Sequence, residues 1–136
     1  MRGLTEEIQL LPQHLVQPLF LVDGKNKSNA IKSLPGMSQL SIDNALKEIE
    51  SCLKVGVNSF ILFPAVEESL KNKTASYSYS AKNFYLKAIA EFKKKFPECC
   101  LISDIAMDPY SSDGHDGYVE NGKIVNDKTL PILAKM

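Results

Sequence analysis

Arginine is almost missing from this sequence: Arg2 is the only arginine among 16 basic residues, and the rest are lysines. Arginine is the residue that most often reads base edges in protein–nucleic acid interfaces, and no basic patch with interleaved aromatic residues takes its place. The 16 acidic residues balance the charge. The composition therefore excludes nucleic acid as an expected partner.

Long apolar runs are also missing. None approaches the ~18 residues that a membrane-spanning helix needs, and no charged-then-apolar leader opens the chain. Cysteine is scarce as well, with Cys52, Cys99 and Cys100 all in apolar surroundings. Such cysteines are typical of free thiols in a reducing compartment, not of a disulfide framework. We expect a cytoplasmic protein that does not cross a membrane.

The 136 residues that are present suit a single domain. Three short apolar runs, residues 18–22, 59–63 and 99–105, are predicted strands. Between them, apolar residues recur at helical spacing over residues 41–53 and 80–96. Alternation of strand and helix is typical of a parallel sheet, so the predicted fold class is α/β.

The predicted boundaries rest on capping and turn residues. Ser41 is a natural N-cap for the first helix, and Gly56 is the expected residue at its C-terminal end. The second helix is predicted to begin near Ser80 and to stop at Pro97. Pro18 fits the first position of the first strand, because a proline has no N–H for a sheet ladder.

Two elements are predicted beyond the third strand. Residues 118–125 form an expected hairpin, since Asn121-Gly122 supplies the two positive φ angles of a type I′ turn. A last helix follows an N-cap at Asn126-Asp127, with Pro131 at its third or fourth position. The chain stops at Met136 inside this helical pattern, so we expect it to be a piece cut from a longer protein.

The segment after the third predicted strand carries the chemistry. In α/β proteins, ligands and metals gather where strands end at their C-terminal side. Asp104 comes first, and a partly desolvated carboxylate there can orient an amine or share a proton with a reacting group. The alternative for Asp104 is a structural carboxylate that accepts loop N–H bonds. The segment contains four carboxylates and an imidazole: Asp104, Asp108, Asp113, His115 and Asp116.

Asp108 and Asp116 flank a tight loop and can converge on one cation. Hard carboxylate ligands suit Mg²⁺ better than a thiolate-bound zinc. His115 is either a ligand or acid, or a hydrogen-bonded spacer, and Asp113 is a turn residue. None of the three strand runs carries a lysine, so the sequence offers no desolvated amine nucleophile.

The residues quoted above resemble a named signature. Residues 104–117 follow the pattern D-x-A-x-D-P-Y-x-S-x-G-H-D-G, the metal-loop motif of the porphobilinogen synthase (5-aminolevulinate dehydratase) family. Further similar blocks occur in the family's order along nearly the whole chain. They are Leu15–Phe20, Leu34–Gly36, Gln39–Asp43, Phe63-Pro64, Gly122–Asp127 and Thr129-Leu130.

This resemblance implies a (β/α)₈ TIM barrel that condenses two molecules of 5-aminolevulinate into porphobilinogen in haem biosynthesis. A complete barrel takes about 250 residues, so residues 1–136 would form one partial domain, the first three βα units. The family's Schiff-base lysines and substrate-binding arginines fall beyond Met136, so the chain alone is expected to be inactive. An alternative is a non-catalytic truncated or split-gene product, at most an acidic-loop metal-binding module.

The resemblance also assigns roles to single residues. Asp104 matches the family's active-site aspartate, and Asp104, Asp108 and Asp116 are the expected substrate-binding residues. Where zinc-dependent members carry three cysteines, this sequence has Ala106, Asp108 and Asp116, which predicts Mg²⁺ in the full-length enzyme and no zinc at this site. The family forms homo-oligomers, but the arm used for octamers is largely absent before Arg2, which argues against an octamer.

Overall fold

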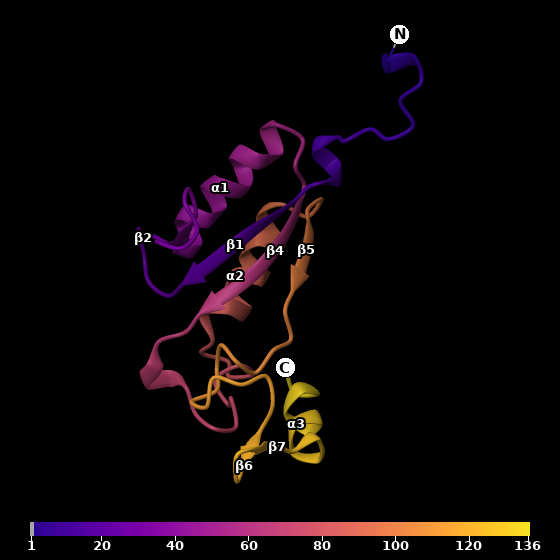
Figure 1. Ribbon diagram of the computed structural model, residues 1–136. Coiled ribbons are helices and arrows are strands. Elements are labelled where there is room, and N and C mark those ends of the chain that lie inside the picture. The colour runs from indigo at the N-terminus through magenta and orange to yellow at the C-terminus, as the bar shows by residue number, and fades with distance from the viewer. Residues whose placement is uncertain (1) are drawn as a thin grey trace.

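The computed structural model describes residues 2–136 and contains a five-stranded sheet with the strand order β2-β3-β1-β4-β5. Its centre is three parallel strands, β1 (Val16–Val22), β4 (Ser59–Ala65) and β5 (Cys100–Ser103). The helices α1 (Ile42–Lys54) and α2 (Phe84–Lys95) connect them in turn. The predicted parallel α/β fold is confirmed (Figure 1).

The two faces of this sheet differ in burial. Leu19 and Leu21 of β1 and Phe60 and Leu62 of β4 are fully buried, because they point toward the helices. Alternate residues point the other way, and among them Ile102 of β5 is 39% exposed. The core therefore lies between the sheet and its helices. On the helix side it contains Ala45, Ile49, Phe84, Tyr85, Ala88 and Phe92.

The sequence predicted Pro18 as the first residue of its strand, but Pro18 is the third residue of β1. Along residues 16–19, β1 pairs with β4 alone, because β3 (Ser38–Leu40) reaches only Phe20 and Leu21. This part of β1 is thus an edge, where a proline is tolerated. The sequence did not predict β3 or its antiparallel partner β2 (Ser28–Ala30), because both are short and polar.

Both long helices begin where small polar residues precede them. Ser41 occupies the predicted N-cap position of α1, and Gly56, at φ +87°, follows the C-cap residue Val55. The predicted start of α2 was wrong by a few residues, because the helix begins after Asn83 and not near Ser80. The side chain of Asn83 accepts a hydrogen bond from the backbone N–H of Tyr85 at 2.9 Å, which satisfies a free donor of the first turn.

The elements after β5 are short. β5 ends at Ser103, two residues before the predicted end, so Asp104 opens the following loop. The predicted hairpin is confirmed as β6 (Val119–Glu120) and β7 (Lys123–Ile124), with positive φ at the two turn residues. α3 (Asn126–Leu133) starts directly after Val125. Pro131 is its sixth residue, deeper than predicted.

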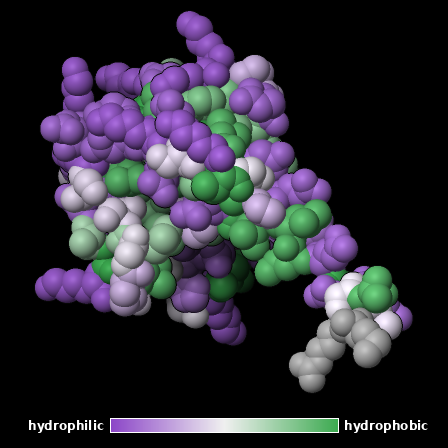
Figure 2. All heavy atoms as spheres, turned by 90° about the horizontal axis from the view of Figure 1, so that it is seen from above, coloured by the Kyte–Doolittle hydropathy of each residue, from purple (hydrophilic) through white to green (hydrophobic). Residues whose placement is uncertain are grey.

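The N-terminal arm, residues 2–15, extends away from the body of the molecule (Figures 1 and 2). It holds two short 3₁₀ turns, η1 (Arg2–Leu4) and η2 (Pro12–His14). Its apolar side chains face solvent: Leu4 is 89% exposed, Ile8 83% and Leu10 77%. Within residues 2–136, no helix has the length and apolar character to cross a membrane.

Candidate functional site

A cavity of about 440 Å³ lies at the carboxyl ends of the parallel strands, and we call it the acidic cavity. In Figure 1 the arrowheads of β1, β4 and β5 point toward the loops that follow β4 and β5, and residues of these loops line the cavity. Its floor includes Phe20 and Phe63, whose stacked rings have centroids 5.4 Å apart. The lining residues are Phe20, Gln39, Phe63, Pro64, Ala65, Lys71, Asp104, Asp108 and Pro109.

Asp104 enters the acidic cavity from the first position after β5. The last paired residue of that strand is Ser103, opposite Leu62 of β4. Asp104 therefore directly follows a hydrogen-bonded ladder, which gives rigid support to a side chain that reaches into an open space. The structure brings Asp104 and Asp108 to the same cavity.

The side chains of Asp108 and Asp116 lie close enough to interact. Burial raises the pKa of the Asp108 carboxyl, and the neighbouring Asp116, with the charge of Asp104, raises it further. Like charges this close disfavour full ionisation of the cluster. Asp108, which lines the cavity, is thus close enough to both Asp104 and Asp116 to be affected by their charges.

Two loops are tied together to hold this cluster. The N–H of Asn72 donates to the carbonyl of Tyr110 at 3.1 Å, and the N–H of Ser112 donates to the carbonyl of Asn72 at 3.3 Å. Met107, fully buried, accepts from the N–H groups of Tyr110 and Ser111. The acidic loop is therefore anchored on the loop that follows β4.

His115 and Asp113, the imidazole and the remaining carboxylate of the loop, are exposed and do not line the acidic cavity. Asp113 takes the turn role predicted for it, since its N–H donates to the hydroxyl of Ser111 at 3.2 Å. Within residues 2–136, no three His, Cys, Asp or Glu side chains are grouped closely enough to hold a metal ion. His115 is thus not gathered with Asp108 and Asp116 into one three-residue site.

Lys71 lines the acidic cavity, which the sequence did not predict. It follows the 3₁₀ turn η3 (Glu68–Leu70) in the loop after β4, and its side chain is only 19% exposed. Its ammonium lies 2.5 Å from the carboxylate of Glu68. No local pattern singles out one of fifteen lysines. The only available signal for Lys71 was its place in the loop that follows the carboxyl end of a strand.

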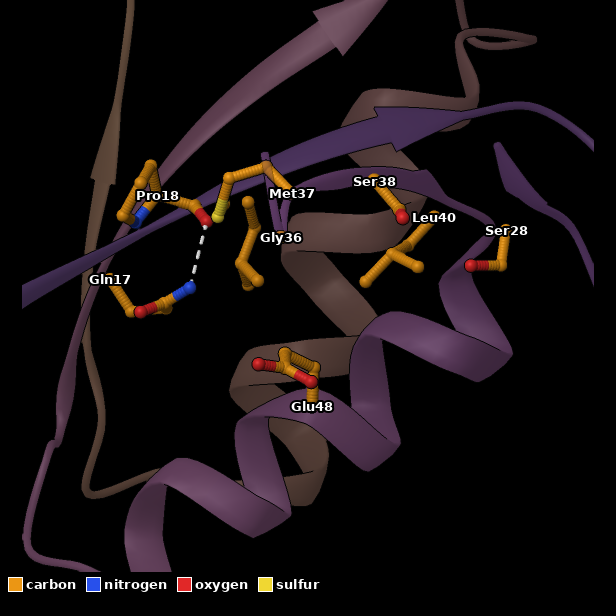
Figure 3. Close-up of a pocket in the computed structure, with 9 residues that line it drawn as sticks. Gln17, Pro18, Ser28, Gly36, Met37, Ser38, Leu40 and Glu48 are labelled. Atoms are coloured by element: carbon orange, nitrogen blue, oxygen red, sulfur yellow. Dashed lines mark hydrogen bonds between the residues drawn. The ribbon is translucent and has the colours of Figure 1, made fainter. Parts of the chain in front are cut away.

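A second hollow, of about 190 Å³, lies between β1, β3 and α1 (Figure 3). Glu48 is its only charged lining residue, and the amide of Gln17 donates to the carbonyl of the adjacent Pro18 at 3.4 Å. None of the residues predicted to carry chemistry reaches it. The acidic cavity is therefore the candidate site.

A parallel sheet with helices on one face and carboxylates at its strand ends is the architecture of a β/α enzyme segment. The comparisons specify which one. The family model of delta-aminolevulinic acid dehydratase matches residues 1–136. The chain belongs to the delta-aminolevulinic acid dehydratase family.

Relatives of known name agree along the chain. The delta-aminolevulinic acid dehydratase of Chlamydia pneumoniae is 42% identical over 135 residues, which are 99% of this chain and 41% of that protein. The one from Bradyrhizobium diazoefficiens is 38% identical, over 98% of this chain and 38% of that protein. The chain thus spans about 40% of the length of these curated relatives.

A solved structure shares the fold. The delta-aminolevulinic acid dehydratase (porphobilinogen synthase) of Toxoplasma gondii, in complex with the reaction product porphobilinogen, superposes with a TM-score of 0.94 at 43% identity. The match covers 98% of this chain and 38% of that one. The parallel strands and helices are therefore part of a TIM barrel, as the resemblance implied.

Proposed function

We propose that this chain is the N-terminal portion of a porphobilinogen synthase, a hydro-lyase that condenses two molecules of 5-aminolevulinate into porphobilinogen. The observation that supports this most directly is that Asp104 and Asp108 line one cavity at the strand ends of a segment of this family, with Asp116 near Asp108. The chain would supply the acidic wall of the active site. Lysines and arginines beyond Met136 would supply the rest.

In this proposal, Asp104 acts on the substrate's amino group. 5-Aminolevulinate carries an amine and a carboxylate, and its condensation moves protons to and from nitrogen. A carboxylate at the mouth of a half-buried cavity can orient an ammonium group and take up its proton. The stacked rings of Phe20 and Phe63 give the adjacent floor an apolar surface that excludes water.

We also propose Mg²⁺ at the Asp108–Asp116 pair. Mg²⁺ binds through one or two carboxylates and keeps several waters, so two aspartates at an exposed loop are enough protein ligands. Bound there, the cation would supply positive charge that neutralises the two carboxylates and attracts a substrate oxygen. No thiolate is present at these positions, and Ala106 cannot bind a metal, which disfavours zinc.

Mg²⁺ is expected to stabilise the protein and Asp108→Asn to abolish the effect. At ten times its Kd, a ligand that binds only the folded state adds about 1.4 kcal/mol of stability. Differential scanning calorimetry with and without Mg²⁺ measures this. Asp113→Asn, an equal change at a turn residue of the same loop, should keep the Mg²⁺ response, and loss of the response in both variants would contradict the assignment.

The pKa of Asp108 also predicts how this response depends on pH. Folding raises the pKa of the Asp108 carboxyl, so without metal the protonated carboxyl favours the folded state at low pH. This contribution to stability is lost as the pH rises through the raised pKa of the folded state. Protons compete with the cation for the carboxylate. Mg²⁺ stabilisation should therefore grow with pH over the same interval.

A second expected result is that borohydride traps no adduct of this chain with 5-aminolevulinate. Schiff-base formation needs a neutral, desolvated amine. Lys71, the lysine of the acidic cavity, is engaged with Glu68 instead. Mass spectrometry after reduction reads out the adduct, with the full-length relative from Chlamydia pneumoniae as a positive control. A stable adduct on this chain would show that it carries the nucleophile.

The proposal is tested by isolating the native protein from its source, measuring its intact mass and assaying porphobilinogen formation. A product more than twice this length that converts 5-aminolevulinate supports the proposal. An inactive product ending at Met136 would support the truncated, non-catalytic alternative. The free cysteines suit the cytoplasm, and the exposed apolar arm suits packing against a second copy in a homo-oligomer.

A further inference from the structure

Tyr85 is a buried polar residue that the proposed function leaves unexplained. It is the second residue of α2, and its side chain is 4% exposed between the helix and the sheet. Its hydroxyl donates to the backbone carbonyl of Leu62 in β4 at 3.0 Å. The Asn83 cap fixes the first turn of the helix and so aims this side chain at the sheet.

The order of the hydrogen bonds between β4 and β5 shows which other backbone group lies near this hydroxyl. The N–H of Cys100 donates to the carbonyl of Asn58 at 2.9 Å, and a parallel ladder repeats every two residues along both strands. Counting forward, the N–H of Asp104 falls opposite the carbonyl of Leu62. The pairing of β4 with β5 ends at Leu62 and Ser103, so this N–H and this carbonyl would form the next hydrogen bond of the ladder.

Tyr85 reaches that same point. Its hydroxyl bonds the Leu62 carbonyl, the residue at which the pairing of β4 with β5 stops, and Asp104 is the next residue after the last paired residue of β5. Burial raises the pKa of Tyr85 to about 12, and the nearby backbone of Asp104 partly opposes this rise. Beside it lies a cavity of about 110 Å³ whose lining includes Tyr85, Ser103 and Asp104.

We propose that Tyr85 is a positioning residue for Asp104: its hydroxyl lies between the ends of β4 and β5, bridges the Leu62 carbonyl to the Asp104 backbone and so sets where the Asp104 carboxylate enters the acidic cavity. Inserting a hydroxyl between two strands widens their separation beyond that of a direct N–H···O=C bond. The strands separate at the point where the site needs space. This inference rests on the proposed function only for its catalytic consequence.

Removal of the hydroxyl leaves both backbone groups without their partner. In Tyr85→Phe the ring still fills its place in the core, but Leu62 and Asp104 must pair directly or with water. Either adjustment moves Asp104 relative to the cavity. A small misplacement of a reacting group costs rate more than binding, so the effect should appear in kcat.

The first measurement uses the unsubstituted chain. The NMR spectrum should show a slowly exchanging hydroxyl proton of Tyr85 with a cross-peak to the amide proton of Asp104. Absence of both signals overturns the proposal. This result needs neither a variant nor catalysis, so it remains decisive if Tyr85→Phe does not fold or if the proposed function fails.

The second measurement uses the full-length enzyme. Tyr85→Phe should lower kcat about tenfold, equal to ~1.4 kcal/mol of activation free energy, with KM within about twofold. Tyr79→Phe is the matched control, because Tyr79 lies in the loop before α2 and is exposed to solvent. Equal kinetics of the two variants would overturn the proposal. A full-length wild type that forms no porphobilinogen would instead refute the proposed function.

Discussion

Asp104→Ala is expected to lower turnover of the full-length enzyme by roughly 10²- to 10⁴-fold, the range that a positioned acid or base contributes. Asp104 is the first residue beyond β5, at the wall of the acidic cavity, and its side chain is exposed. Its removal takes away the group proposed to hold the substrate's amine and accept its proton. Steady-state formation of porphobilinogen measures the loss.

The control for this experiment is Asp113→Ala. Asp113 is an exposed turn residue of the same loop, so its removal changes the net charge equally without reaching the cavity. Circular dichroism should show an unchanged fold for both variants. If Asp104→Ala turns over like the wild type, Asp104 is not part of the active site.

Phe60→Ala is expected to destabilise the protein by about 3–5 kcal/mol. Phe60 is the second residue of β4, pairs with Gln17 of β1 and Leu101 of β5, and is fully buried. It belongs to the core cluster that also contains buried residues of both long helices, so its removal leaves a cavity inside the packed core. Urea unfolding of the protein that contains this chain measures the loss.

The matched control is Phe63→Ala, three residues along the same strand. Phe63 points to the opposite face, where it is half-buried and stacks on Phe20. A ring that still contacts solvent loses less transfer free energy when truncated. Phe63→Ala should therefore cost clearly less. Equal losses would mean that the core does not lie on the helix side of the sheet.

The acidic site was predicted in part from the sequence. Asp104, Asp108 and Asp116 were predicted because a dense group of carboxylates directly follows an apolar strand, and the ends of parallel strands are where ligands collect. The structure places Asp104 and Asp108 at one cavity and Asp116 near Asp108. Lys71 and Tyr85 were not predicted, because each reaches the site from another element by a contact between residues distant in sequence.

The fold was predicted best where the signal is local and repeated. Both long helices and the three parallel strands show their periodicity over many residues, and the Asn121-Gly122 turn has a conformation that few residue pairs allow. β2 and β3 were missed, because each has only three residues, too few to show a period, and each pairs only when the neighbouring strand is present. The start of α2 was misplaced, because several polar residues there can serve as a cap.

The sequence by itself determined the fold class, the family resemblance and the acidic loop, because periodicity, capping and motif spacing are properties of neighbouring residues. Only the tertiary structure decided which side chains face the cavity, that Asp108 lies near Asp116, and that Tyr85 bonds the Leu62 carbonyl where β4 and β5 stop pairing. Those contacts depend on strand register and on the angle at which a helix crosses the sheet. Both are set by packing of the whole core.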